Sequence, residues 1–164
     1  MSANQSSDTL ALDGAGRLYT LWSDEAGLPV LAWSANRGHT WSQPVRITPA
    51  GVVQAVLPSL TVAADGRIGV SYYGTTDKQV WTGFMAISAD GTRPQPEFAT
   101  PAVTPPGAPL MPEPCCWASG PQEYTAARWA PDGSLWAAFA ATTAKGDARG
   151  IMGHLVPVGG KRGQ

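Results

Sequence analysis

Charged side chains are scarce in this sequence. Asp, Glu, Lys and Arg together make up 14% of the 164 residues, whereas an average domain contains about 25%. The formal net charge is -1, and Lys161-Arg162 is the one adjacent basic pair. Because there is no basic stripe, the sequence does not indicate nucleic acid or an anionic membrane surface as a partner.

Cysteine is nearly absent, since Cys115 and Cys116 are the only two. One adjacent pair gives neither a disulfide framework nor the CxxC spacing of many metal sites. Such a pair can close a strained ring disulfide, bind a thiophilic metal or stay reduced in an apolar pocket. Trp117 beside the pair favours packing, and no third or fourth metal ligand is evident. We therefore expect no cofactor, and Cys115 and Cys116 are the residues that a metal would use.

Long apolar runs are missing as well. None approaches the roughly 18 residues of a membrane-spanning helix, so we expect no membrane partner. Residues 1–8 contain neither the basic nor the apolar region of a signal peptide. No stretch keeps the i, i+3, i+4 apolar spacing of a helix, and we expect essentially none. The 19 glycines, 15 prolines and 7 tryptophans favour a β protein with tight turns.

Internal repetition is the most informative feature that the sequence has. Three stretches share one pattern, in which a short apolar segment precedes a glycine turn carrying Asp and a second, alternating segment ends in an aromatic residue. These stretches are residues 9–22, 59–73 and 126–139. Asp and Gly between two β-prone segments predict a hairpin, because glycine adopts positive φ at little steric cost. The sequence therefore predicts three equivalent hairpins.

Further strands are expected after each hairpin. Third strands are predicted at residues 29–34, 79–88 and 150–156, and fourth strands near 43–48 and 96–100. A repeat of about 50 residues with four short strands has the size of a propeller blade. We therefore expect an all-β fold of about three four-stranded antiparallel blades. The expected units are blades at 8–50 and 55–100, a proline-rich loop at 101–121, an incomplete blade at 122–158 and a flexible tail at 159–164.

One loop carries a recognisable motif, S-A-N-R-G-H-T-W, between the third and fourth strands of the first repeat. The side chain of Asn36 can bond backbone groups two residues on and hold a turn, and Gly38 permits positive φ. Ser34 and Thr40 can hydrogen-bond within the loop, and Trp41 can pack beneath it as an apolar anchor. The loop resembles the Asp-box, the S-x-D-x-G-x-T-W signature of sialidase-type (BNR) repeats, with Asn36 in place of Asp.

The resemblance implies a partial β-propeller of the sialidase-like superfamily. It covers most of residues 8–158, and residues 88–92 resemble a shortened second Asp-box. Asp-boxes of that superfamily lie on the rim away from the active site, so the resemblance implies structural roles for the motif residues. It also implies a carbohydrate ligand and an extracellular or periplasmic location, although this chain shows no signal peptide.

Sialidase chemistry would need residues that the chain shows only in part. The resemblance implies three arginines on the carboxylate of sialic acid, a Tyr nucleophile assisted by Glu, and an Asp acid/base. The Arg-Ile-Pro motif that marks the first family arginine is absent. The sequence therefore leaves an enzymatic role open and favours a non-catalytic one.

Glu123 and Tyr124 are the candidate ligand-binding residues. They precede the first strand of the third repeat, and alignment of the hairpin glycines places them at the mouth of the propeller funnel. Glu123 would serve as an acceptor or base, and Tyr124 as a stacking or hydroxyl group; alternatively, Glu123 lies in solvent and Tyr124 is half-buried. Arg128, further along the strand, either points inward or pairs with Glu123. These three residues are also the candidates for a catalytic role.

Three blades cannot close a ring, and an open stack exposes two apolar faces. We expect first that the chain is part of a longer protein or an incomplete gene model. The alternatives are two copies that pair about a two-fold axis into six blades, or a different chain that completes the ring. Three functions stay open: a propeller that binds glycan or protein ligands, the C-terminal part of an exo-sialidase-like glycoside hydrolase, and a structural assembly subunit.

Overall fold

The computed structural model describes residues 9–91, 93–105, 107–110, 125–142 and 148–156. Within these ranges the chain forms three antiparallel β-sheets and no helix, so the expectation of an all-β protein is confirmed. It follows that none of the described residues belongs to a helix capable of crossing a membrane.

Each sheet is built from strands that follow one another along the chain and pair with their sequence neighbours. The first sheet contains β1 (Thr9–Leu12), β2 (Leu18–Ser23), β3 (Pro29–Ser34) and β4 (Val45–Arg46). The second sheet contains β5 (Gln54–Val62), β6 (Ile68–Thr75) and β7 (Thr82–Ser88). The third sheet contains β8 (Ala126–Trp129), β9 (Leu135–Thr142) and β10 (Ala148–Leu155).

The first hairpin of every sheet has the same turn. The residue that opens the turn donates its N–H to the carbonyl four positions later, and a glycine three positions on donates back to the carbonyl of the opening residue. These glycines are Gly16, Gly66 and Gly133, with φ of 77°, 88° and 82°. A side chain would strain this conformation, so the glycine determines where each hairpin turns. The three equivalent hairpins expected from the sequence are confirmed.

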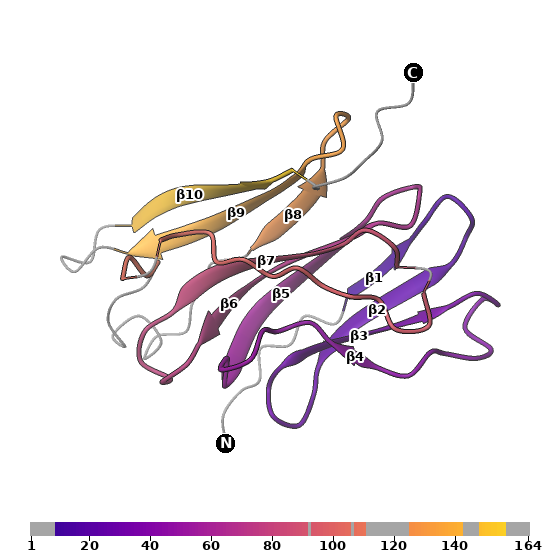
Figure 1. Ribbon diagram of the computed structural model, residues 1–164, viewed down its shortest axis with the longest axis horizontal. Helices are drawn as coiled ribbons and strands as arrows, with labels where there is room; N and C mark the ends of the chain where they lie inside the picture. Colours follow the sequence, from indigo (N-terminus) through magenta and orange to yellow (C-terminus); the bar gives the residue numbers. More distant parts are fainter. Residues whose placement is uncertain (1–8, 92, 106, 111–124, 143–147, 157–164) are drawn as a thin grey trace.

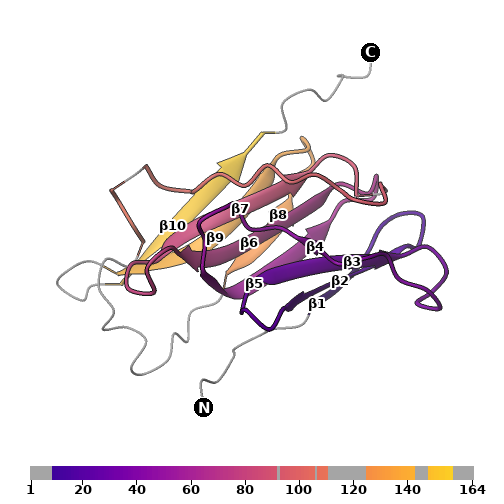
Figure 2. The same cartoon turned by 60° about the horizontal axis from the view of Figure 1, so that its bottom comes forward.

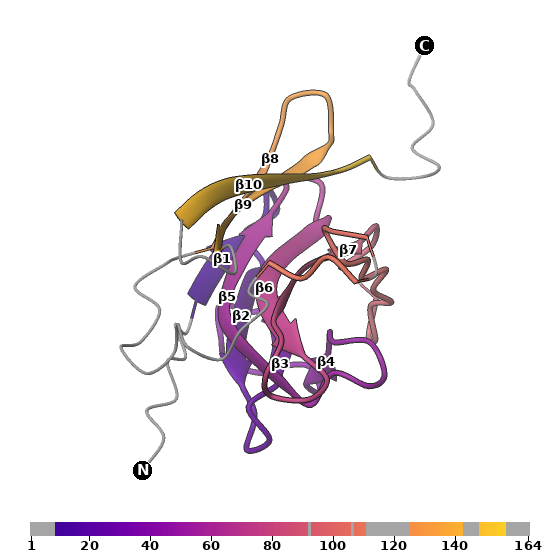
Figure 3. The same ribbon diagram turned by 90° about the vertical axis from the view of Figure 1, so that its left-hand side faces the viewer.

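The sheets lie in chain order, with the second sheet between the other two (Figures 1 and 2). Their first strands are neighbours, because β5 contacts both β1 and β8. Figure 3 shows the third sheet lying above the strands of the second. This succession of packed antiparallel sheets is consistent with part of a propeller-like fold.

Each junction between sheets encloses its own apolar core. The core of the first junction includes Tyr19, Leu21, Leu31, Leu60, Ile68, Val70 and Tyr72. The core of the second junction includes Tyr73, Met85, Ala127, Leu135, Ala137 and Phe139. A β-carbon on Gly69 would overlap Cδ1 of Leu135. The missing side chain at Gly69 therefore lets the second and third sheets approach closely.

The fourth strand expected in the second repeat is only partly formed. Residues 98–103 run antiparallel to β7 but make isolated bridges with it instead of a continuous strand. Pro101 accepts a hydrogen bond from the N–H of Met85 at 3.2 Å, and proline has no N–H to return. The proline-rich segment, expected as a loop outside the sheets, therefore begins with residues that are bound to β7.

Candidate functional site

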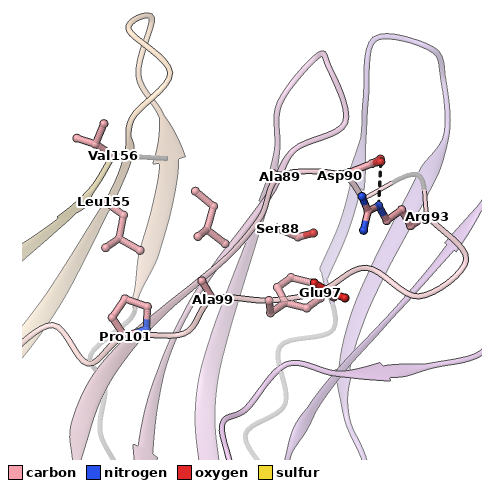
Figure 4. A pocket seen from close by; sticks show the side chains of 11 residues that line it. Ser88, Ala89, Asp90, Arg93, Glu97, Ala99, Pro101, Leu155 and Val156 are labelled. Carbon is pink, nitrogen blue, oxygen red and sulfur yellow. Dashed lines mark ion pairs between the residues drawn. The ribbon is translucent and has the colours of Figure 1, made fainter. Parts of the chain in front are cut away.

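A pocket lies between the second and third sheets (Figure 4). It is bounded by the end of β7 with the residues that follow, by residues 97–101 and by the end of β10. Its volume is about 640 Å³, which falls within the roughly 300–1,000 Å³ of small-molecule sites. It lies at the end of the sheets that carries the first hairpins, because Ser88 pairs with Ile68 and Leu155 pairs with Leu135.

Apolar side chains form most of the pocket wall. The wall consists of Ile87, Phe98, Ala99, Pro101, Leu155 and Val156. Phe98 is half-buried and packs against the core of the first junction, whereas Val156 is 67% exposed. The pocket can therefore cover an apolar face of a ligand and still leave the ligand in contact with water.

Polar groups occupy the opposite side of the pocket. Figure 4 shows Leu155 and Pro101 on one side and the Asp90–Arg93 pair on the other. Arg93 Nε lies 3.4 Å from Asp90 Oδ2. Glu97 is exposed and forms no ion pair with any described residue, while the Ser88 side chain is buried beside it in the lining. The two carboxylates outnumber the single guanidinium, so the polar side carries net negative charge.

Backbone contacts hold the two walls that carry these polar groups. Ile87 and Ala99 exchange reciprocal N–H···O bonds of 2.8 and 2.9 Å, which fix residues 97–101 against β7. Gly91 donates its N–H to Gly66 O at 3.2 Å, and a β-carbon on Gly91 would lie only 2.6 Å from that oxygen. The indole N–H of Trp33 donates to Arg93 O at 3.2 Å. The loop after β7 is therefore anchored to both the first and the second sheet.

The arrangement offers both acceptors and donors beside an apolar wall. Carboxylates accept hydrogen bonds, a guanidinium donates them, and a serine hydroxyl does both. Such a set matches a ligand that carries many hydroxyl groups on one side and C–H groups on the other. Among the described ranges, no three His, Cys, Asp or Glu side chains gather into a metal-binding group.

Four of the residues singled out from the sequence lie outside the described residues. They are Glu123, Tyr124, Cys115 and Cys116. Arg128 is described and exposed, and its Nη1 donates to the carbonyl of the adjacent Ala127 at 2.8 Å. It pairs across the strands with Trp136 and is absent from the pocket lining. Arg128, the candidate that the structure does describe, therefore takes no part in this pocket.

The loop that resembles an Asp-box is held by its own side chains. Ser34 Oγ accepts the N–H of Gly38 at 2.9 Å, and Asn36 Oδ1 accepts the N–H of Thr40 at 2.9 Å. Asn36 Nδ2 also donates to Thr40 Oγ1 at 2.9 Å. The ring of Trp41 lies beside Gly38 but remains 43% exposed, so it covers the loop only in part. These contacts stabilise the loop and give it no direct part in the pocket.

The pocket itself was missed by the sequence reasoning. Residues 88–92 attracted attention only as a shortened Asp-box, and residues 96–100 only as a fourth strand. One pattern could have pointed to its polar residues, because Ser88 and Ser34 are equivalent ends of third strands. A loop follows each of these serines. A search for polar residues in those loops would have singled out Asp90 and Arg93.

Comparisons with known proteins show likenesses of fold. No protein-family model matches the sequence, and no curated protein matches it. A protein of unknown function from Dyadobacter fermentans is 16% identical, with a TM-score of 0.57 over 95% of this chain and 53% of that one. A Hadza microbial sialidase is 13% identical, with a TM-score of 0.57 over 88% of this chain and 34% of that one. A fucose lectin from Kordia zhangzhouensis is 11% identical, with a TM-score of 0.49 over 92% of this chain and 97% of that one.

The chain thus spans about half the length of the first of these proteins and about a third of the sialidase. The first two likenesses show a shared all-β fold. They agree with the succession of antiparallel sheets described above.

Proposed function

We propose that this chain is a non-catalytic, glycan-binding part of a sialidase-like propeller and that the pocket between the second and third sheets is its binding site. The observation that carries the proposal is the composition of that pocket. Leu155 and Pro101 lie on one side of the pocket and Asp90 and Arg93 on the other, and Phe98 and Glu97 also line its volume of about 640 Å³. Sugars present C–H faces that pack on apolar rings and hydroxyl groups that bond carboxylates and guanidinium groups.

The charge of the pocket favours a neutral glycan over a sialylated one. Asp90 and Glu97 supply two negative charges, and Arg93 supplies one positive charge that Asp90 already faces at 3.4 Å. The carboxylate of an anionic sugar would meet a surplus of like charge here. Neutral hydroxyl groups would instead donate to the carboxylate of Glu97 and accept from the guanidinium of Arg93.

The partners of the arginines argue against sialidase chemistry. Arg17, Arg46 and Arg67 pair with carboxylates of hairpin turns at 2.6, 2.8 and 2.9 Å. These guanidinium groups hold turns, so they do not converge on one carboxylate site as sialidase chemistry requires. A non-catalytic role therefore fits the described arginines better than glycoside hydrolysis does.

Binding to a glycan array of neutral and sialylated oligosaccharides tests the proposal. We expect neutral glycans to bind and sialylated ones to bind more weakly. For the strongest neutral ligand, Glu97→Gln should raise the Kd about tenfold, because a charged acceptor is lost from the site. The matched control is Glu25→Gln, an exposed carboxylate in the turn between β2 and β3, which should leave the Kd unchanged. Equal effects of both variants would contradict the proposed site.

The fold that this chain shares with a sialidase supports a second candidate function, as part of an exo-sialidase-like hydrolase. Turnover of a fluorogenic sialoside by the intact chain, abolished by Tyr124→Phe, would replace the proposal with that candidate. Absence of both turnover and array binding would favour a structural assembly subunit instead.

A further inference from the structure

Apolar residues on the outer face of the first sheet are exposed where their counterparts are buried. Counted back from the glycine of the first hairpin, Leu10 corresponds to Leu60 in the second sheet and Ala127 in the third. Leu60 is 8% and Ala127 is 0% exposed, because each packs against the preceding sheet. Leu10 is 63% and Leu12 is 58% exposed. The face of the first sheet that carries Leu10 and Leu12 is therefore equivalent to the faces on which the other two sheets pack against a preceding sheet. We call it the rear face.

Apolar residues on the outer face of the third sheet are also exposed, but their buried counterparts pack against the following sheet instead of the preceding one. Cross-strand register makes Met152 the counterpart of Leu31 and Met85. Leu31 is 0% and Met85 is 1% exposed, because each packs against the following sheet, whereas Met152 is 70% exposed. Trp136 is likewise 38% exposed, although its counterpart Tyr19 is fully buried. The face of the third sheet that carries Met152 and Trp136 is therefore equivalent to the faces on which the other two sheets pack against a following sheet. We call it the forward face.

The two open faces are the two kinds of face that pack against each other inside this chain. Both junctions within the chain place a forward face on a rear face, and both enclose an apolar core. The chain thus carries one unused forward face and one unused rear face. Exposed apolar patches of this kind mark interaction surfaces.

We propose that a second copy of this chain covers both faces. The forward face of each copy would pack on the rear face of the other, and a two-fold axis would close six sheets into one ring. Pairing of two like faces would leave the other kind in water, whereas this arrangement covers both. The D. fermentans protein is roughly as long as two copies of this chain, because the match covers 95% of this chain and 53% of that one at a TM-score of 0.57.

The mass of the full chain in solution, measured by light scattering after size-exclusion chromatography, tests the proposal. We expect twice the monomer mass of 17.1 kDa. A monomer would overturn the proposal in favour of further sheets supplied by a longer polypeptide or another protein. A series of larger, open assemblies would overturn the closed two-fold ring.

Single substitutions test which faces meet. Leu10→Asp on the rear face and Met152→Asp on the forward face should each give a folded monomer, because a buried unpaired carboxylate opposes association. Val53→Asp is the matched control, since Val53 is 43% exposed in the connection before β5 and lies in no strand. It should leave the mass at that of a dimer. Far-UV circular dichroism checks that every variant stays folded.

Mixing the two interface variants gives the sharpest result. The Leu10→Asp copy keeps an intact forward face, and the Met152→Asp copy keeps an intact rear face. We therefore expect the mixture to form a heterodimer with one native junction, although each variant alone is a monomer. If Leu10→Asp stays dimeric while Met152→Asp does not, forward faces pair with each other and the proposal is wrong.

Discussion

At the scale of single residues, one buried carboxylate organises the first hairpin. The Asp13 side chain has no exposed surface. It accepts the N–H groups of Ala15 and Arg17 at 2.9 and 3.0 Å, Arg17 Nε at 2.6 Å and the Tyr19 hydroxyl at 3.0 Å. Burial pushes the pKa of Asp13 upward, but the hydrogen bonds from Arg17, Tyr19 and Ala15 outweigh it and lower the pKa below its usual value. Burial and the bond to Asp13 raise the pKa of Tyr19 to about 12.

Asp13→Asn should lower the free energy of unfolding at neutral pH by about 1.5–3 kcal/mol, the range for hydrogen bonds to charged groups. Because the folded-state pKa of Asp13 is depressed, its contribution is present above the unfolded-state pKa of about 3.9 and is lost as pH falls through the folded-state pKa. Urea unfolding at neutral and acid pH should therefore show the two proteins converge below about pH 4. Asp65→Asn is the control, since Asp65 lies in the equivalent turn with its side chain 58% exposed. A pH-independent difference would contradict this account.

The Asp-box-like loop gives a second prediction at this scale. Asn36→Ala removes the acceptor of the Thr40 N–H and the donor to Thr40 Oγ1, and should cost about 1 kcal/mol of stability. Asn36→Asp keeps the acceptor, and the Thr40 hydroxyl can donate to the new carboxylate, so it should change stability by less than about 0.5 kcal/mol. Thermal unfolding of both variants measures the difference. Equal losses would show that the side-chain oxygen of Asn36 does not hold the loop.

At the scale of elements, one arginine joins the first hairpins of the second and third sheets. Arg67 pairs with Asp65 at 2.9 Å and donates through Nη1 to Gly133 O at 2.9 Å. Its guanidinium also lies 4.6 Å from the centre of the Trp129 ring. A charge, a carbonyl and an aromatic face therefore hold the β8–β9 hairpin against the second sheet.

Arg67→Ala should loosen the β8–β9 hairpin without unfolding the first sheet. We expect faster amide exchange at Gly133, which donates to Ala130 O at 2.9 Å, and at Ala130. Exchange at Gly16 in the equivalent hairpin of the first sheet should not change. Arg46→Ala is the control, because among the described residues the Arg46 side chain pairs with Asp24 alone and is 55% exposed. Uniform acceleration across all three sheets would contradict a local role for Arg67.

The hairpins could be predicted from the sequence because their causes are local. Glycine at the position of positive φ and Asp in the turn are visible in any six-residue window, as at Gly66 and Gly133. The end of the second repeat was harder to predict, since Pro101 in the middle of its pairing with β7 offers only a carbonyl group. The pocket could not be located in this way, because Glu97 and Leu155 come to line the same cavity only after two sheets have packed.

At the scale of the whole molecule, the same kind of junction between sheets occurs twice. The two outer faces are equivalent to the faces that form these junctions. The second sheet is covered on both faces, whereas the first and third sheets are each covered on one. The pocket belongs to this level too, since it lies where the second sheet meets the third (Figure 4). Packing of equivalent sheets therefore creates both the proposed binding site and the proposed surfaces for a second copy.

The most direct test of the proposed binding site is an NMR titration of the full, isotope-labelled chain with the strongest neutral glycan from the array. We expect backbone amide signals to shift at Ser88 of the second sheet, at Ala99 beside it and at Leu155 of the third, which line the pocket. Shifts confined to the turns at the other end of the sheets, around Gly27 and Lys78, would contradict it.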